Sequence, residues 1–555
     1  MEKRVVIFLV LSLAVILGYD LLLKQLGLLP PADTVQEPPS ESSEVRRGDP
    51  DASTSGTGGG PSGSTAPARP DVPPPQTASS NQVQSRERTV VIETDLVRVS
   101  LDARGGMISG WELKRHHTSP PEEKPVQLVH QGAKFKGPLS IATSDAAADK
   151  VLRDGLYEIE TDFASLDSTH PVGHATLRFQ EPGSGLKVLK RLTFHQGSYL
   201  VDVALTVEGL TAGYDVVLGT NFGIVEWGDG FIGLIGSASQ VDGAVAKETP
   251  DTEMERKGAV QWVALQDKYF LSVLMPQGAS AALAKKEGEK LVSAGVRMPR
   301  GADTTTLQLY AGPKEYDTLR SFNVGLEETI DFGWFIFGSW SVVKAVAKPI
   351  FYVLRFINEY THNYGVTIIL LTMGIKLLFV PLQFKSYKSM KQMQMIQPKV
   401  LALQEKHKDD RDKLNKELIK LYRDHRVNPV GGCLPMVLQM PVFVALFNIL
   451  YMTIDLRQAP FVGWITDLSV QDPYYVLPII MGATMVIQQK ITPTTMDPTQ
   501  AKIMLVLPVF MTFLFINFPA GLVLYWLTNN VLTIGQQLLT DRVYANRPFI
   551  VEPAK

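Results

Sequence analysis

A single lysine lies in the middle of a segment that is otherwise apolar enough to cross a lipid bilayer. The segment runs from Tyr364 to Phe384, YGVTIILLTMGIKLLFVPLQF, and the lysine is Lys376. The next basic residue, Lys385, is nine residues away, or roughly 13 Å along a helix, and a lysine side chain covers only part of that distance. Because an ammonium group in hydrocarbon is costly, a charge at this depth indicates a functional site.

Polar side chains recur in the other apolar segments. Thr372 lies one helical turn before Lys376, and Gln383 lies two turns after it on the same face. Later segments add an amide in CLPMVLQMPVFVALF and a polar face in GLVLYWLTNNVLTIGQQLL. The candidate site residues are Thr372, Lys376, Gln383, Gln439, Trp526, Asn530 and Thr533.

Two interpretations of these residues are open. Amides and hydroxyls on facing helices can hold a membrane bundle together by hydrogen bonds. Alternatively, they line a water-filled groove. Lys376 favours the groove, because the five apolar segments contain no Asp or Glu that would pair with it. We expect the groove to open toward the cytoplasm, where basic residues gather.

Two of the apolar segments are short. Helices over 473–489 and 503–518 would each be about 25 Å long, less than the ~30 Å hydrocarbon core of a bilayer. Lipid beside such helices becomes thinner. A polar groove next to thinned lipid lets a hydrophilic segment cross most of the bilayer without entering hydrocarbon. The pattern therefore predicts movement of polypeptide rather than an ion pore.

The elements that position these residues form a multi-domain protein, with an N-terminal transmembrane anchor, an all-β extracytoplasmic sandwich and an α-helical five-span membrane core. The expected boundaries are 1–29 for the anchor, 30–88 for a disordered tether, 89–335 for the sandwich, 338–362 for an interfacial helix, 363–540 for the core and 541–555 for a cytoplasmic tail. The core includes a cytoplasmic helical hairpin at 385–428, and its spans are expected near 364–384, 430–452, 473–489, 503–518 and 520–539.

The N-terminal part of the chain reads as an anchor followed by a tether. The apolar stretch Val5–Leu23 follows two basic residues and lacks a small-residue cleavage site after it, which favours an uncleaved anchor over a secretory signal. Residues 30–88 contain eleven prolines and no aromatic residue. Such a composition cannot bury enough surface to offset the entropy of ordering, so we expect disorder.

Short runs of alternating polar and apolar residues begin at Arg88. Runs such as LKVLKRLTF, YLVDVALTVEG and TTLQLYAG, separated by Gly, Pro and Asp, predict a large antiparallel β-sandwich. His116 and His117 are expected in a turn, and Asp267 and Lys268 between strands. Neither pair has a nucleophile or metal ligand at useful spacing, so we expect solvated loop residues, no catalytic residues, no metal and no cofactor.

The segment WSVVKAVAKPIFYVLRFINEY predicts an amphipathic helix. Lys344, Lys348, Arg355 and Glu359 fall within one arc of about 60° at 100° per residue. A transmembrane orientation would bury these four charges, so the helix is expected to lie in the membrane interface. The alternative is a helix docked on the β domain.

The distribution of basic residues fixes the expected topology. Residues 385–426 hold twelve Lys and Arg against six Asp and Glu, whereas the loop 453–472 has only Arg457. Basic residues concentrate in cytoplasmic segments. This predicts a cytoplasmic hairpin, a cytoplasmic N-terminus and C-terminus, and the sandwich on the opposite side of the membrane.

Several long motifs resemble the YidC membrane insertases of Gram-negative bacteria. They are VNPVGGCLPMVLQMPVFVALF, LRQAPF, DLSVQDPYYVLPIIMGATMVIQQKITPTTMDP and NFPAGLVLYW, within a similarity that covers the whole chain. The resemblance implies an inner-membrane insertase and chaperone with a periplasmic domain. It also implies that the protein acts on nascent membrane proteins delivered by ribosomes, either alone or together with the Sec translocon. The lipid bilayer is a further implied partner. No sequence-specific contact with nucleic acid is expected.

The resemblance also carries residue roles. In the family an arginine typically stands in the groove, five residues before a Pro-Leu pair, and here that position is Lys376. Lysine keeps the charge but not the bidentate geometry of a guanidinium. Thr372 and Trp526 resemble the substrate-contacting threonine and aromatic residue of the family. No GxxxxGK[ST] motif or acidic Mg²⁺ cluster occurs, so we expect no ATP hydrolysis by this chain.

Two other classes of function compete with this interpretation. Charged residues within a bundle favour a small-solute or ion transporter, but five spans do not divide into two equal repeats, and no pair of half-helices brackets a site at the midplane. A membrane-anchored sugar-binding or sugar-modifying enzyme would need converging histidines and carboxylates in the sandwich, which the pattern does not supply. Depletion of the protein separates these alternatives, because it would impair either membrane protein insertion or solute uptake.

Overall fold

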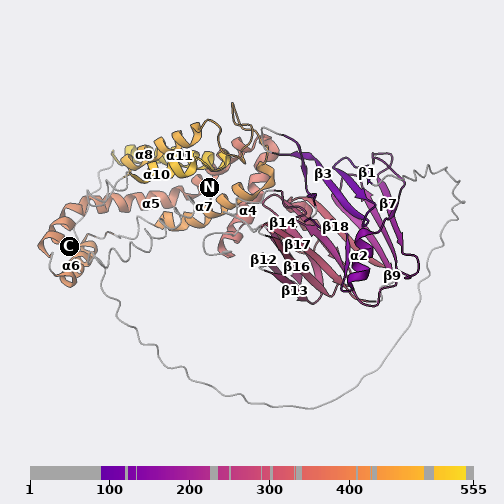
Figure 1. Ribbon diagram of the computed structural model, residues 1–555. Helices are drawn as coiled ribbons and strands as arrows, with labels where there is room; N and C mark the ends of the chain where they lie inside the picture. Colours follow the sequence, from indigo (N-terminus) through magenta and orange to yellow (C-terminus); the bar gives the residue numbers. More distant parts are fainter. Residues whose placement is uncertain are drawn as a thin grey trace, which may run out of the picture. The chain divides into compact units, whose positions relative to one another are not determined.

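The computed structural model describes residues 89–545, apart from 119–122, 133, 226–235, 249–251, 289, 301–303, 331, 333–340, 408–409, 426, 428–433 and 493–505. The expected anchor at 1–29, the tether at 30–88 and most of the tail at 541–555 lie outside the described residues. The described part consists of a β-rich region followed by a helical region (Figure 1). The expected multi-domain class is confirmed at this level.

The described residues of the β domain, 89–313, form three antiparallel sheets rather than the two of a simple sandwich. The first sheet has the strand order β1 (Thr89–Glu93), β2 (Val97–Asp102), β3 (Met107–His117) and β4 (Pro125–Gln127). The second has the order β13 (Glu253–Lys257), β16 (Ala281–Gly288), β17 (Leu291–Met298), β10 (Tyr214–Thr220) and β5 (Ile141–Thr143). The third has the order β12 (Ala244–Glu248), β11 (Gly236–Val241), β14 (Val260–Gln266), β15 (Phe270–Pro276), β18 (Thr305–Pro313), β9 (Leu200–Glu208), β8 (Lys187–His195), β7 (Val172–Gln180) and β6 (Glu158–Thr161).

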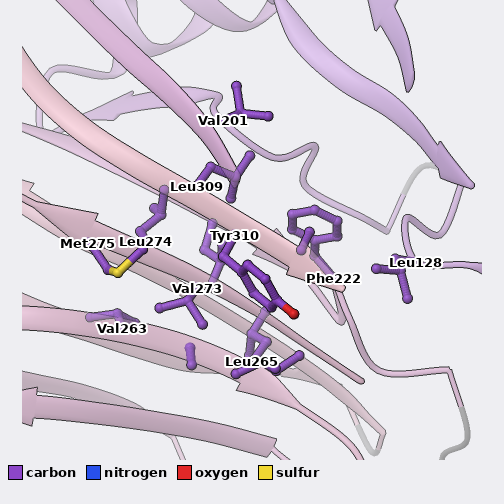
Figure 2. Close-up of a cluster of buried hydrophobic side chains, with 14 of the residues drawn as sticks. Leu128, Val201, Phe222, Val263, Leu265, Val273, Leu274, Met275, Leu309 and Tyr310 are labelled. Carbon is purple, nitrogen blue, oxygen red and sulfur yellow. The ribbon is translucent and has the colours of Figure 1, made fainter. Parts of the chain in front are cut away.

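Alternation along the strands builds the core of this domain. In β8 every second side chain is buried, and the same pattern recurs in β7 and β9. Figure 2 shows the inner side chains of β14, β15 and β18 gathered around Phe222 and Tyr310. Each such apolar side chain contributes roughly 1.5–3 kcal/mol when it leaves water. Trp111 of β3 joins the first sheet to this core, because its Nε1 donates to the carbonyl of Ala311 at 3.0 Å.

One inward position of β8 carries a charge that the alternation does not reveal. Lys190 is 2% exposed and donates to the main-chain carbonyls of Gly106 at 2.6 Å and Leu139 at 2.8 Å. Its Nζ lies 4.9 Å from the centroid of the Tyr157 ring. Burial lowers the pKa of Lys190 to about 7.

The residues considered for catalysis in the β domain have structural roles. His116 and His117 end strand β3 rather than sitting in a turn, which corrects the prediction. Burial, together with nearby Arg457, lowers the pKa of His116 to about 4. Asp267 is 1% exposed rather than solvated, and it caps the β14–β15 turn by accepting from the amides of Tyr269 and Phe270.

The helix expected at 338–362 is α4 (Ser341–Thr361), and it packs on the end of the β-rich region. It follows α3 (Tyr316–Ser321) and the 3-10 turn η1 (Leu326–Thr329). Its inner side chains include Val343 and Phe351, which belong to the same buried cluster as the β domain. Lys344 and Lys348 pair with Glu328 at 3.4 and 3.6 Å, and Arg355 pairs with Asp317.

These contacts are of the kind that the docked alternative predicts. The arc is directed largely at carboxylates of α3 and η1, as a docked helix requires. The helix still exposes a separate apolar set, made up of Val342, Tyr352, Val353, Phe356 and Tyr360. The placement of that set in the membrane interface therefore stays a prediction.

The helical region begins with α5 (Tyr364–Lys406), which Asn363 caps by accepting from the amide of Val366. It continues with α6 (Arg411–Asp424), α7 (Leu434–Met452), the short η3 (Ile454–Leu456), α8 (Val476–Ile491), α10 (Val506–Phe515) and α11 (Ala520–Ala545). Within the described residues, α5 alone is both long and apolar enough to cross a membrane, and α7, α8 and α10 include shorter apolar helices. The helix α5 also runs unbroken from the first expected span into the expected hairpin, where it ends at Lys406 before α6 begins at Arg411.

Candidate functional site

Lys376 occupies a nearly closed position between two helices that are distant in the sequence. It lies on α5 and is 7% exposed, and its Nζ donates to Oγ1 of Thr533 on α11 at 2.8 Å. Thr533 in turn donates to the carbonyl of Asn529 at 2.6 Å, one turn earlier in α11. The structure therefore brings together two of the predicted site residues, and the oxygen that meets the ammonium belongs to a hydroxyl rather than a carboxylate.

Asn530 and Gln537 connect α11 to a third helix. Asn530 is 3% exposed, and its Nδ2 donates to Oγ1 of Thr484 on α8 at 3.3 Å. Gln537 donates to the carbonyl of Ile491 at 2.6 Å and accepts from Thr492 at 3.3 Å. The last half of α11 thus has polar contacts on two sides, toward α5 and toward α8.

Thr484 and Thr492 are members of this set that the sequence pattern did not single out. Both lie on or directly after α8, in the stretch ATMVIQQKIT. A lone threonine in an apolar helix is a weak signal, because its hydroxyl is normally satisfied by the carbonyl four residues earlier. Thr484 carries a comparable bond, donating to Met481, and its oxygen accepts from Asn530 as well.

Two predicted site residues have other surroundings. Thr372 is 2% exposed and donates to the carbonyl of Ile368 at 2.6 Å within its own helix. Trp526 is half-buried in an aromatic cluster, with its ring centroid 4.7 Å from that of Phe515 and 5.0 Å from that of Phe443. The structure does not bring either side chain to the ammonium of Lys376.

The remaining predicted residues, Gln383 and Gln439, are half-buried. Gln383 lies on α5 just before the basic stretch, and Gln439 lies on α7. Among the described residues, no group of three or more His, Cys, Asp or Glu side chains is placed to hold a metal ion. The chemistry available here is hydrogen bonding and charge attraction, without a nucleophile and its base.

Comparison with known proteins gives the family. Residues 89–353 match the family model described as YidC periplasmic domain, and residues 356–547 match the model described as 60Kd inner membrane protein. The membrane protein insertase YidC of Syntrophus aciditrophicus (strain SB) is 38% identical over 98% of this chain and 100% of its own length. The insertase YidC of Geotalea daltonii is 37% identical over 98% of this chain and 99% of its own.

The chain belongs to the YidC family of membrane protein insertases. It is an inner-membrane protein with a periplasmic domain and not an enzyme. The crystal structure titled "Active YidC insertase crystal structure with the first transmembrane domain resolved" is 17% identical, covers 84% of this chain and 94% of its own, and has a TM-score of 0.34. The match of residues 89–353 to the family model identifies the β domain as the YidC periplasmic domain. The substrates of an insertase are nascent membrane proteins.

Proposed function

We propose that this YidC insertase moves hydrophilic segments of nascent membrane proteins along a polar path between α5 and α11 that opens toward the cytoplasm when a substrate arrives. Lys376 supplies the attraction. It is 7% exposed, and the sequence of the five apolar segments offers it no carboxylate. A nascent chain with an acidic segment brings the missing partner, so that the ammonium gains a charge-assisted hydrogen bond in place of the bond to Thr533.

The driving force does not require ATP. Transfer of the apolar segment of the substrate into lipid contributes ~25 cal/mol per Å² of buried surface. The membrane potential adds about 2.3 kcal/mol per charge per 100 mV for acidic segments that move outward. A helix that buries several hundred Å² therefore inserts without another energy source. We further propose that the protein acts alone or with the Sec translocon, and that the basic hairpin of α5 and α6 meets ribosomes and emerging chains.

Substitution of Lys376 tests the role of charge. We expect Lys376→Arg to retain insertion and Lys376→Ala to impair it, most strongly for substrates with acidic translocated segments. Loss of one charge-assisted hydrogen bond, about 1.5–3 kcal/mol, predicts roughly a tenfold or larger slowing for those substrates. Lys490→Ala is the matched control, since it removes an exposed lysine at the end of α8, outside the hairpin. Equal insertion of acidic and purely apolar substrates by Lys376→Ala would refute the proposal.

Water access to the site needs a separate measurement. In a protein whose Cys433 is replaced, Lys376→Cys should react with a membrane-impermeant thiol reagent from the cytoplasmic side and not from the periplasmic side. A thiol that is unreactive from both sides, in a protein whose Lys376→Ala variant is fully active, would show that the lysine is a buried structural residue.

A further inference from the structure

Asp541 is the only acidic residue of α11, and it lies in the last turn of that helix. A carboxylate is unfavourable there, because the C-terminal end of a helix carries partial negative charge. The position is explained by partners on another helix. The hydroxyl of Tyr387 donates to Oδ1 of Asp541, and Nζ of Lys391 lies 3.3 Å from the same oxygen.

Tyr387 and Lys391 are one turn apart on α5, so that both reach Asp541 from one face of the helix. Tyr387 is 6% exposed, whereas the side chains of Lys391 and Asp541 are 34% and 36% exposed. Nζ of Lys391 also lies 5.6 Å from the ring centroid of Tyr387. We name these three residues, Tyr387, Lys391 and Asp541, the latch. It combines a sheltered hydrogen bond with an ion pair that water and ions can reach.

The latch joins the stem of the basic hairpin to the last helix of the bundle. Residues 385–399 of α5 contain four basic residues and no acidic ones, so Asp541 brings a carboxylate to an otherwise cationic stretch. Deeper in the bundle the same two helices meet through Lys376 and Thr533. Lys376 and Tyr387 are eleven residues apart, which is roughly 16 Å along α5. The latch therefore closes the cytoplasmic end of the seam whose inner end is Lys376.

We propose that Asp541 is a positioning residue that holds the hairpin stem against α11 and closes the cytoplasmic mouth of the path in the resting insertase. An acidic segment of a nascent chain opens the mouth by competing with Asp541 for Lys391. The idea rests on the proposed function, since it assigns the entry step of the same path. The latch would make the mouth of the path select for acidic segments before these segments reach Lys376.

The resting geometry is measured without any substrate. Nitroxide labels are placed on the full-length protein in lipid nanodiscs at Met395→Cys and Leu539→Cys, two exposed neutral positions on either side of the latch, with Cys433 replaced. Pulsed electron paramagnetic resonance then gives the distance distribution. We expect one narrow distribution for the parent. In Asp541→Ala the population at longer distances should rise about 5- to 20-fold, as loss of a hydrogen bond and an ion pair implies.

Two further variants identify the interaction. Tyr387→Phe removes only the hydroxyl and should give a smaller rise. The double variant Lys391→Asp with Asp541→Lys reverses the pair and should restore the narrow distribution. Unchanged distances in Asp541→Ala would overturn the latch, and a reversed pair that stays open would overturn its ionic basis. Lys388→Ala, an exposed lysine of the same stretch, is the control and should leave the distances unchanged.

Insertion assays then test the entry step. Asp541→Ala should reduce the advantage of acidic over neutral substrates several-fold in initial rate, and the reversed pair should not recover that advantage, because the mouth then presents an aspartate on α5. Equal substrate preference in the parent and in Asp541→Ala would refute the role in entry. If Lys376→Ala leaves insertion intact while Asp541→Ala lengthens the distances between the labels, the proposed path is refuted and the latch is still supported.

Discussion

Lys190 provides a quantitative test of the β domain, because its charge is buried among carbonyl groups. Its Nζ has three main-chain acceptors within 3.4 Å, those of Gly105, Gly106 and Leu139. These bonds do not compensate the loss of hydration, and the pKa of Lys190 falls to about 7. In the unfolded chain the same lysine titrates near 10.4. Folding above neutral pH therefore expels a proton.

The sign and size of the effect follow from this difference. Below pH 7 both states hold the proton, and the domain bears the full cost of the buried charge. Between about pH 7 and 10 the unfolded state binds one more proton, so the free energy of unfolding rises with pH by about 1.4 kcal/mol per unit. From pH 7.5 to 9.5 the gain is about 3 kcal/mol, which for a domain of this size raises Tm by roughly 6–12 °C.

The measurement is the thermal unfolding of the purified full-length protein at a series of pH values, compared with Lys190→Met. The difference in Tm between the two proteins should change with pH by the amount above, because every other titrating group is common to both. Lys187→Met is the control, since Lys187 is an exposed residue of the same strand. Parallel curves for the parent and Lys190→Met from pH 7.5 to 9.5 would refute a depressed pKa at Lys190.

Three further changes test the contributions of the periplasmic domain, the hairpin and the packing of the helical region. Deleting most of residues 30–312, with α3 and η1 kept as partners of α4, should leave substantial insertion; complete loss in a stably expressed variant would place part of the mechanism in the periplasmic domain. Deleting 385–426 should lower insertion of radiolabelled substrate while the rest of the helical region still folds, and failure of the protein to accumulate would contradict this. Gly365→Val should destabilise the bundle by about 1–3 kcal/mol, seen as a lower Tm, because an added Cβ would lie 2.0 Å from the ring of Phe461; an unchanged Tm would contradict that packing.

Periodicity predicts the elements better than it predicts their partners. The runs LKVLKRLTF and YLVDVALTVEG are strands β8 and β9, because alternation reports directly which face is buried. The same alternation assigns Lys190 to the inner face, where a lysine is unexpected. The sequence pattern does not reveal the main-chain carbonyls of Gly105, Gly106 and Leu139 that accept its hydrogen bonds. Strands β11 and β17 escaped the pattern, since strands that are buried on both faces lose alternation. Strand β13 escaped it for another reason, because its sequence EMERK is mostly charged and none of its side chains is buried.

The candidate site shows the same limit. A helical wheel places Trp526, Asn530 and Thr533 on one face of α11, but it does not say which neighbour each residue meets. In the structure Trp526 packs on Phe515, Asn530 meets α8 and Thr533 meets Lys376. In a bundle each helix packs against several others. The polar residues on one broad face of a helix can therefore contact different neighbouring helices. The contact between positions 376 and 533 depends on how α5 and α11 pack, which no local pattern contains.

The two halves of α11 are held by different forces, and the difference bears on how the bundle can open. From Ala520 to Tyr525 its side chains are at most 7% exposed and belong to an apolar cluster with α5, α7 and α8. From Asn529 onward its contacts with other helices include hydrogen bonds to Lys376, Thr484 and Ile491 and the latch at Asp541. When helices part within a bilayer, the apolar half loses its close van der Waals packing, and no polar group takes the place of those contacts. A hydrogen bond contributes only about 0.5–1.5 kcal/mol net, since water or a polar substrate replaces it. The C-terminal half can therefore separate and close again while the other half stays packed. The proposed path and the latch lie in this C-terminal half.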